Sequence, residues 1–169
     1  MAGAAAPTVL HAQVIGANNQ PGIAGTEIDI PVMLDALPDG GYREIAASFR
    51  IPADLTVTDV VFGAGVTGSS TWTVKDDQLE LTVTGDGVAL EGDGDAVEFA
   101  VIKTKLKELQ AEDKTISILP DYILVKGDTY VAYNLANVKA DIGLLKTENG
   151  GAWAKAPGYG NPLVSYKYG

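Results

Sequence analysis

Apolar and polar residues alternate with a period of two along most of this chain, and turn residues interrupt the alternation at short intervals. Ile45, Ala47 and Phe49 fall in one phase, and the residues between them fall in the other. In an extended strand these two phases lie on opposite faces. Helical periodicity is almost absent, since its best candidate, residues 105–112, makes two turns at most. This pattern predicts an all-β fold of about nine short strands, arranged as a sandwich or barrel.

The expected strands are bounded by Gly, Pro, Asn and Asp. They cover residues 8–16, 27–34, 45–51, 55–62, 72–74, 79–83, 97–106, 116–125 and 138–145. Asp76 and Asp77 separate two of these strands and predict a hairpin. Trp72 shares the phase of Val74 and is expected to point inward. Pro31 lacks a backbone N–H, so it favours a sheet edge or a bulge over the middle of a regular strand.

The composition is typical of one globular domain with an acidic surface. The 169 residues are 46% hydrophobic and 20% charged, and without Cys they form no disulfide. There are 22 Asp and Glu against 12 Lys and Arg, a net charge of −10. Such a charge repels phosphate backbones and anionic lipid headgroups, so nucleic acids and membrane surfaces are poor partners. No stretch approaches the roughly 20 apolar residues of a spanning helix, so we expect no membrane insertion.

The sequence contains motifs that also occur in enzymes, but the neighbouring residues do not provide the structure that these motifs require. Residues 63–68 match G-x-G-x-x-G. The strand-like residues 69–74 follow, whereas a dinucleotide site requires a helix there. His11 is the single histidine, no G-x-S-x-G elbow accompanies it, and one histidine is too few for a typical zinc site. We therefore expect no catalytic residue and no cofactor.

Acidic residues gather in the turns. They are Asp76, Asp77, Asp86, Glu91, Asp93 and Asp95. Their spacing departs from the calcium-loop pattern, and nothing indicates two carboxyl groups facing each other across a cleft, so we expect neither a metal site nor glycoside hydrolysis. Val88, Ala89 and Leu90 lie within this acidic segment. They either turn into the core or form an exposed apolar contact patch rimmed by charge.

The order of these segments resembles a cohesin, the module with which cellulosomal scaffoldins capture dockerins. The resemblance covers residues 8–146 and is carried by three stretches, residues 28–40, 47–63 and 86–103. Its motifs are of low specificity. The family's frequent Tyr-Asp-Pro is replaced here by residues 50–54, Arg-Ile-Pro-Ala-Asp, and residues 148–169 have no counterpart. The match is thus to a divergent cohesin.

The resemblance implies a jelly-roll β-sandwich whose function is to bind a dockerin through a flat sheet face without catalysis. Calcium would then be carried by the dockerin, and this chain would need no cofactor. In the family, the binding face consists of outward strand residues around a small apolar centre. The matching positions of this chain are taken from the resemblance. The implied contacts are Glu44, Ala46, Ser48, Arg50, Thr71, Thr73, Lys75, Glu80, Thr82 and Thr84, with Val88 and Leu90 as the apolar centre. The helices of dockerins often carry Lys or Arg, so the acidic excess would speed their encounter with this chain.

Two alternatives remain open: a jelly-roll carbohydrate-binding module, and an adhesion or structural surface module. Sugar binding needs exposed aromatic rings that stack on sugar faces. The plausible platform comprises Tyr42, Tyr122, Tyr130, Tyr133 and Trp153.

The two ends of the chain carry further expectations. Residues 1–7 are expected to be disordered, either an expression remnant or the end of a signal-peptide region. Residues 147–169 form a Gly-, Pro- and aromatic-rich extension that we expect to be ordered and packed on the sandwich through Trp153, Tyr159, Leu163 and Tyr166. A secreted parent predicts an extracellular or bacterial cell-surface location, and we expect a monomer.

Overall fold

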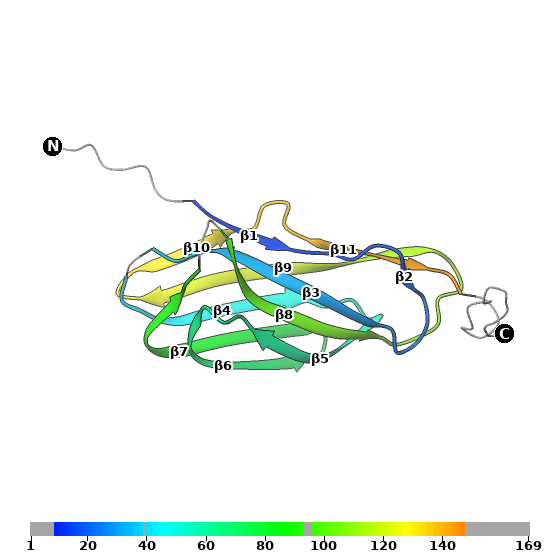
Figure 1. Cartoon of the computed structure of the whole chain (residues 1–169), viewed down its shortest axis with the longest axis horizontal. Coiled ribbons are helices and arrows are strands. Elements are labelled where there is room, and N and C mark those ends of the chain that lie inside the picture. The colour runs from blue at the N-terminus through cyan, green and yellow to red at the C-terminus, as the bar shows by residue number, and fades with distance from the viewer. Residues whose placement is uncertain (1–8, 39, 93–95, 148–169) are drawn as a thin grey trace.

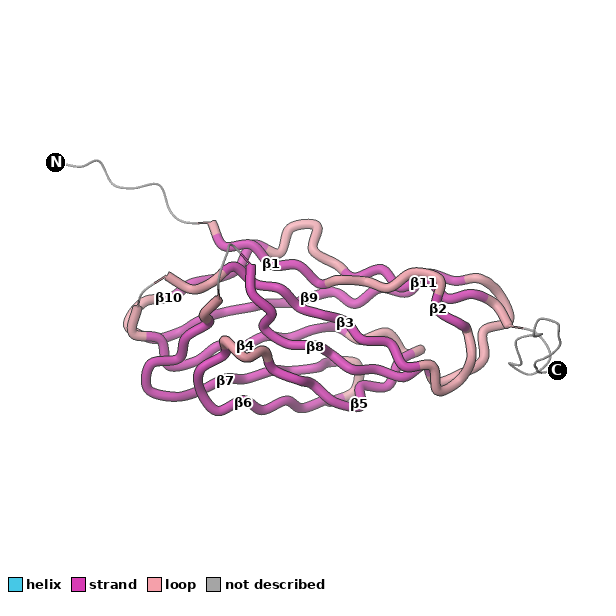
Figure 2. The backbone as a smooth tube through the Cα atoms, in the orientation of Figure 1, coloured by secondary structure: helices cyan, strands magenta, loops and turns pink. Residues whose placement is uncertain are grey.

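The structure, a computed structural model, describes residues 9–38, 40–92 and 96–147. Within these ranges it consists of strands joined by turns and loops, with no helix (Figure 2). The expected all-β jelly-roll sandwich is confirmed. The predictions for residues 1–7, for Asp93 and Asp95, and for segment 148–169 lie outside the described residues.

The chain forms eleven strands. In order they are β1 (Leu10–Val14), β2 (Gln20–Pro21), β3 (Glu27–Asp35), β4 (Tyr42–Arg50), β5 (Leu55–Phe62), β6 (Val66–Lys75), β7 (Gln78–Leu90), β8 (Ala96–Leu106), β9 (Lys114–Gly127), β10 (Tyr130–Asn134) and β11 (Ala140–Leu145).

The strands form two layers that are joined along one side. Hydrogen bonding follows the order β5-β8-β3-β1-β10-β9-β4-β7-β6, and β11 extends the second layer by pairing with β9 and β2. In Figure 1, β3 and β8 of the first layer run in front of β4 and β9 of the second. The parallel pairing of β1 with β10 connects the layers. At the other side the order ends at β5 and β6, so the described part of the sandwich is open there.

The core lies between the layers because the period-two pattern turns one apolar row of each strand inward. Phe49 and Phe99 are fully buried. The ring of Phe99 meets the ring of Phe62 edge to face, with 5.9 Å between the centroids. Trp72 packs against this core, as its phase with Val74 predicts.

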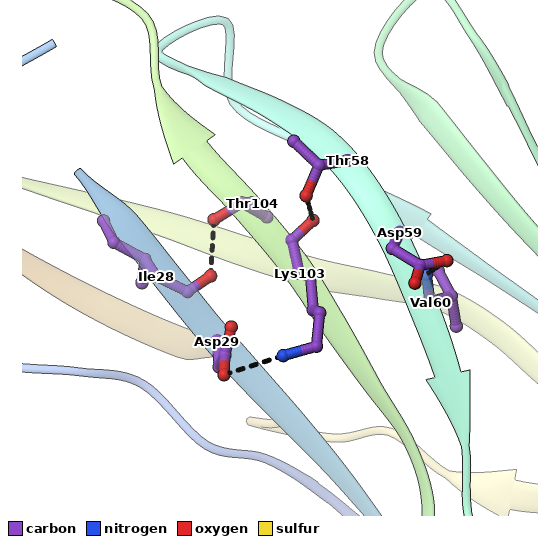
Figure 3. A network of polar contacts seen from close by, with 7 residues as sticks. All are labelled: Ile28, Asp29, Thr58, Asp59, Val60, Lys103 and Thr104. Carbon is purple, nitrogen blue, oxygen red and sulfur yellow. Dashed lines mark hydrogen bonds and ion pairs between the residues drawn. The ribbon is translucent and has the colours of Figure 1, made fainter. Parts of the chain in front are cut away.

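Polar contacts tie the strands of the first layer (Figure 3). The buried Thr104 hydroxyl of β8 donates to the Ile28 carbonyl of β3 at 2.7 Å. Lys103 Nζ lies 3.1 Å from Asp29 Oδ2. On the other side of β8, the Thr58 hydroxyl donates to the Lys103 carbonyl at 3.3 Å. Thr58 lies in the register shift of β5 between Val57 and Asp59.

The expected hairpin is present, whereas Pro31 lies near a bulge but within β3, a strand that pairs with β1 on one side and β8 on the other. β6 and β7 pair antiparallel across Asp76, whose φ of 58° is left-handed, and Asp77. Pro31 lies one residue before the bulge between Val32 and Met33.

Two sequence-based expectations about the elements are wrong. Residues 105–112 form no helix, because β8 continues to Leu106, which exchanges backbone hydrogen bonds with Gly25 and Thr26. The strand Tyr130–Asn134 was not expected. It exists because β9 continues to Gly127 and the chain turns back to pair with it.

Candidate partner-binding face

The contacts that the resemblance implies lie on β4, β6 and β7, and the outer surface of these strands continues across β9 and β10 as one broad face. We call it the candidate face. The register places Ala46 of β4 between Leu124 of β9 and Thr82 of β7, and Thr82 also neighbours Thr71 of β6. The adjacent residues in each strand, such as Ala47 and Leu81, are buried. Antiparallel pairing thus places these side chains side by side on one surface.

Most of the assigned residues share this face. They are Glu44, Ala46, Arg50, Thr71, Thr73, Lys75, Glu80, Thr82 and Thr84, in mutual register on β4, β6 and β7. Glu44, Ala46 and Thr82 are half-buried, and the others are exposed. Their role in binding stays a prediction, whereas their common location is a property of the fold.

Ser48 was expected to be an exposed contact, and this is wrong. It lies in register between Tyr122 and Glu80, but it is fully buried. The Gln78 side chain covers it, with Nε2 donating to the Ser48 hydroxyl at 2.6 Å and also to Asp121 Oδ2. Ser48 therefore supports the surface from beneath.

The expectation that Val88 and Leu90 form the exposed apolar centre is also wrong. Both are 2% exposed and belong to the core. β7 bulges against β6, since Ser69 pairs with Thr84 while Thr67 pairs with Ala89. The bulge includes Gly87 at a φ of 84°. Before the bulge the odd-numbered residues of β7, up to Val83, point into the core. Beyond the bulge the even-numbered residues do, so Val88 and Leu90 turn inward.

The apolar part of the candidate face comes instead from β9 and β10. Leu119 is 42%, Tyr122 36% and Tyr130 64% exposed, and Leu124 is half-buried beside Ala46. The sequence reasoning proposed Tyr122 and Tyr130 for sugar stacking only, and it missed Leu119 and Leu124. The sequence does contain a signal for the outward position of Leu124, because residues 122–125 form an unbroken apolar run. A run without alternation indicates a strand that presents apolar side chains on both faces.

Charges on the candidate face occur in opposite pairs. Lys126 Nζ lies 4.0 Å from Glu44 Oε2, and an Arg50 Nη lies 3.8 Å from Asp121 Oδ1. Glu80 and Lys75 on the same face are of opposite sign, and Asp86, in the bulged part of β7, is an exposed acid with no ion pair among the described residues. Most of the acidic excess of the molecule therefore lies outside this face.

The described residues offer limited material for other sites. His11 is exposed, and its Nδ1 lies 3.1 Å from Asp35 Oδ2 at the end of the neighbouring β3. In the described ranges no group of three or more His, Cys, Asp or Glu side chains is placed to hold a metal ion. Nor does any helix there have the length and hydropathy to cross a membrane.

The aromatic platform expected for sugar binding is not assembled from the residues described. Tyr42 and Tyr133 are buried at 3% and 5% exposure. Tyr122 and Tyr130 are exposed, and Trp153 lies outside the described residues. The candidate face thus carries two exposed rings within an aliphatic and threonine-rich surface.

Solved structures share this two-layered arrangement. The seventh ScaB type I cohesin from Pseudobacteroides cellulosolvens superposes with a TM-score of 0.65, covering 83% of this chain and 95% of that one at 14% identity. The chain has the cohesin fold. The cohesin of the Coh-OlpC-Doc435 complex from Clostridium thermocellum gives a TM-score of 0.65 at 16% identity, covering 87% of this chain and all of that one.

Cohesin folds of this kind also occur outside cellulosomes. The non-cellulosomal cohesin from the archaeon Archaeoglobus fulgidus gives a TM-score of 0.60 at 15% identity, covering 83% of this chain and 94% of that one. No protein-family model and no curated protein matches the sequence. The likeness therefore lies in the fold and is not accompanied by close sequence identity.

Proposed function

We propose that this chain is a non-catalytic module that binds a dockerin through the candidate face, for the assembly or surface attachment of carbohydrate-active enzymes. The observation that carries the proposal is the broad, ordered outer face of β10, β9, β4, β7 and β6 in a cohesin fold. Among the solved neighbours are type I cohesin–dockerin complexes from Clostridium thermocellum. The partner of this chain is accordingly a dockerin of an enzyme or scaffoldin.

The composition of the face supports a partner that folds separately. Leu119, Tyr122 and Leu124 provide a small apolar area, and threonines and paired charges surround it. Interfaces between independently stable proteins combine such a centre with a polar rim. The rigid strands also present these side chains with little loss of conformational freedom on binding.

The remaining parts of the proposal concern calcium, assembly and location. Calcium belongs to the dockerin, so chelation should abolish binding by unfolding the partner while this chain stays folded. The chain acts as a monomer, outside the cell or on a bacterial cell surface.

Binding to a panel of purified dockerins, measured by calorimetry with and without EDTA, tests the function. Leu119→Asp places a charge on the apolar part of the face, and Ala46→Arg places a bulky charge at its centre. We expect each variant to weaken binding at least about tenfold, because desolvating an added charge at the interface costs more than about 1.4 kcal/mol, even for a carboxylate at position 119 across from Arg50.

Val61→Asp is the matched control for this test. Val61 is 46% exposed, close to the 42% of Leu119, but it lies on the outer face of β5 in the other layer. It should leave the affinity unchanged. Capture of no dockerin, together with retention on cellulose or starch that Tyr122→Ala abolishes, would show that the face binds glycans.

A further inference from the structure

The core is incompletely covered where the two end strands of the sandwich approach each other. A cavity of about 280 Å³ lies there between the start of β5 and the end of β6. Ile51, Leu55, Val57 and Val74 form its apolar lining, and Ile51 and Leu55 are buried at 5% and 3% exposure. The cavity therefore opens directly onto the apolar core.

Val74 is an inward-row residue that the described part of the chain leaves partly uncovered. It pairs with Leu79, which is fully buried, so both side chains belong to the inward row of the second layer. Val74 nevertheless remains 44% exposed. Burying an exposed apolar side chain contributes about 25 cal/mol per Å² removed from water, so an apolar occupant of this cavity would be stabilised.

A continuous surface leads from this cavity to the last residue that the structure describes. The Thr147 N–H donates to the Gln110 carbonyl at 3.0 Å. Gln110 lines a neighbouring depression, also about 280 Å³, which shares Ala53 and Lys107 with the apolar cavity. Thr147 is thus fixed at one end of a path whose other end is the exposed side of Val74.

The chain beyond Thr147 is long enough to follow this path as far as Lys107, which lines the cavity. Lys107 is three residues from Gln110, so their Cα atoms are at most about 11 Å apart. Trp153 follows Thr147 by six residues, which span up to about 20 Å when extended. Gly150 and Gly151 in between allow sharp changes of direction. Trp153 is the first aromatic residue after Thr147 and is able to reach the cavity.

We propose that the C-terminal segment folds back along this path and places the Trp153 indole in the cavity between β5 and β6. The charges at the rim fit this occupant. Asp76, Asp77 and Lys107 line the cavity, so the acids outnumber the cation there, and neither carboxylate forms an ion pair within the described residues. Lys155, two residues after Trp153, brings a positive charge to them.

This occupant is favoured over a separate molecule because it is tethered. The short connection from Thr147 gives Trp153 a local concentration in the millimolar range, far above that of a second copy in solution. Docking also covers the ends of β5 and β6, where free strand edges invite association. The inference is independent of the candidate face and holds whether or not that face binds a dockerin.

Methyl NMR of the full chain tests the inference. An aromatic ring shifts the resonances of methyl groups that it contacts, so Trp153→Ala should move the methyl signals of Leu55, Val57 and Val74. The matched control is Tyr166→Ala, which removes a ring from the same segment and should leave these signals in place. Lys155→Glu, facing the two carboxylates, should move them part of the way toward their positions in Trp153→Ala.

Each result decides for or against the inference. Signals that move on Trp153→Ala, stay in place on Tyr166→Ala and do not depend on protein concentration support intramolecular docking. Signals that Trp153→Ala leaves unchanged overturn it. Signals that change with dilution show that a second copy fills the cavity, which also overturns it.

Discussion

Ser48 illustrates how a polar residue of the candidate face contributes through folding. Its hydroxyl is fully buried and accepts a hydrogen bond from Gln78 Nε2 at 2.6 Å. We expect Ser48→Ala to lower the free energy of unfolding by about 0.5–1.5 kcal/mol, the net value of such a hydrogen bond, because Gln78 keeps Asp121 as a partner. Urea denaturation measures this loss.

A matched substitution separates stability from recognition. Thr73→Ala removes a hydroxyl from an exposed position on the same face and should change the unfolding free energy by less than about 0.5 kcal/mol. If Ser48→Ala left stability unchanged but weakened dockerin binding, Ser48 would be a direct contact after all.

At individual positions, the alternating pattern predicts the face on which a strand residue lies but not how deeply it is buried. Alternation was sufficient to place Glu44 and Ala46 on one face of their strand, because strand residues of the same phase share a face. That Thr82 and Thr84 of another strand lie on the same surface was implied by the resemblance to cohesins, and the register confirms it. Alternation was not sufficient for Ser48, since burial there depends on a glutamine from the neighbouring strand. Contacts between strands that are far apart in sequence are invisible to a periodic pattern.

At the scale of elements, the sequence predicts which face of a strand each residue occupies only as far as the first β-bulge in that strand. The inward phase of β7 changes between Val83 and Val88, so the apolar residues expected at the surface belong to the core. The acidic, glycine-rich composition of this segment indicated a loop, whereas pairing with β6 extends the strand to Leu90. Bulges are set by the pairing of two strands, and the sequence of one strand does not reveal them.

The strand β10 depends on a buried tyrosine. The Tyr133 hydroxyl donates to the Asp35 carbonyl at the end of β3 at 2.7 Å, which ties β10 to the other layer. Burial raises the pKa of Tyr133, and the nearby Asp35 and Tyr42 raise it further. We expect Tyr133→Phe to cost about 0.5–1.5 kcal/mol of unfolding free energy at neutral pH through the lost hydrogen bond.

The raised pKa gives this contribution a defined pH dependence. Because the folded state holds the proton more tightly than the unfolded state, the stabilisation is fully present below the ordinary tyrosine pKa of 10.0 and declines as the pH rises above it. The Tyr133→Phe variant has no hydroxyl to titrate at this position. The difference in unfolding free energy between the unsubstituted protein and this variant should therefore shrink at alkaline pH. Urea denaturation of both proteins from pH 7 to 11 measures this difference in unfolding free energy. A difference that widened as the pH rose would contradict a raised pKa for Tyr133.

At the scale of the whole molecule, the acidic excess and the candidate face are separate features. The net charge is −10, yet Glu44, Glu80 and Asp121 on the face are balanced by Arg50, Lys75 and Lys126, which leaves Asp86 as its unbalanced acid. Any long-range attraction toward a basic partner of the kind proposed above would therefore arise mainly from the rest of the surface. Contacts that hold the complex together would lie among the apolar and threonine positions between the paired charges.

This separation predicts how salt affects the two rates of dockerin binding. Raising the ionic strength from 0.01 M to 0.15 M shortens the screening length from about 30 Å to about 8 Å, so association with a dockerin that carries Lys and Arg should slow clearly. Dissociation should change much less, since short-range contacts dominate it. Stopped-flow mixing and surface plasmon resonance measure the two rates, and association that is independent of salt would contradict steering.

Two charge variants locate the source of the steering. Glu44→Gln with Glu80→Gln, on the candidate face, and Glu27→Gln with Glu98→Gln, on the opposite layer, change the net charge equally. If the overall field steers the partner, both pairs should slow association at low salt. The pair on the face should also alter dissociation, because it leaves Lys126 without the carboxylate of Glu44 at the interface. An unchanged association rate for Glu27→Gln with Glu98→Gln would place the steering charge on the face itself, and the acidic excess elsewhere would then have no part in recognition.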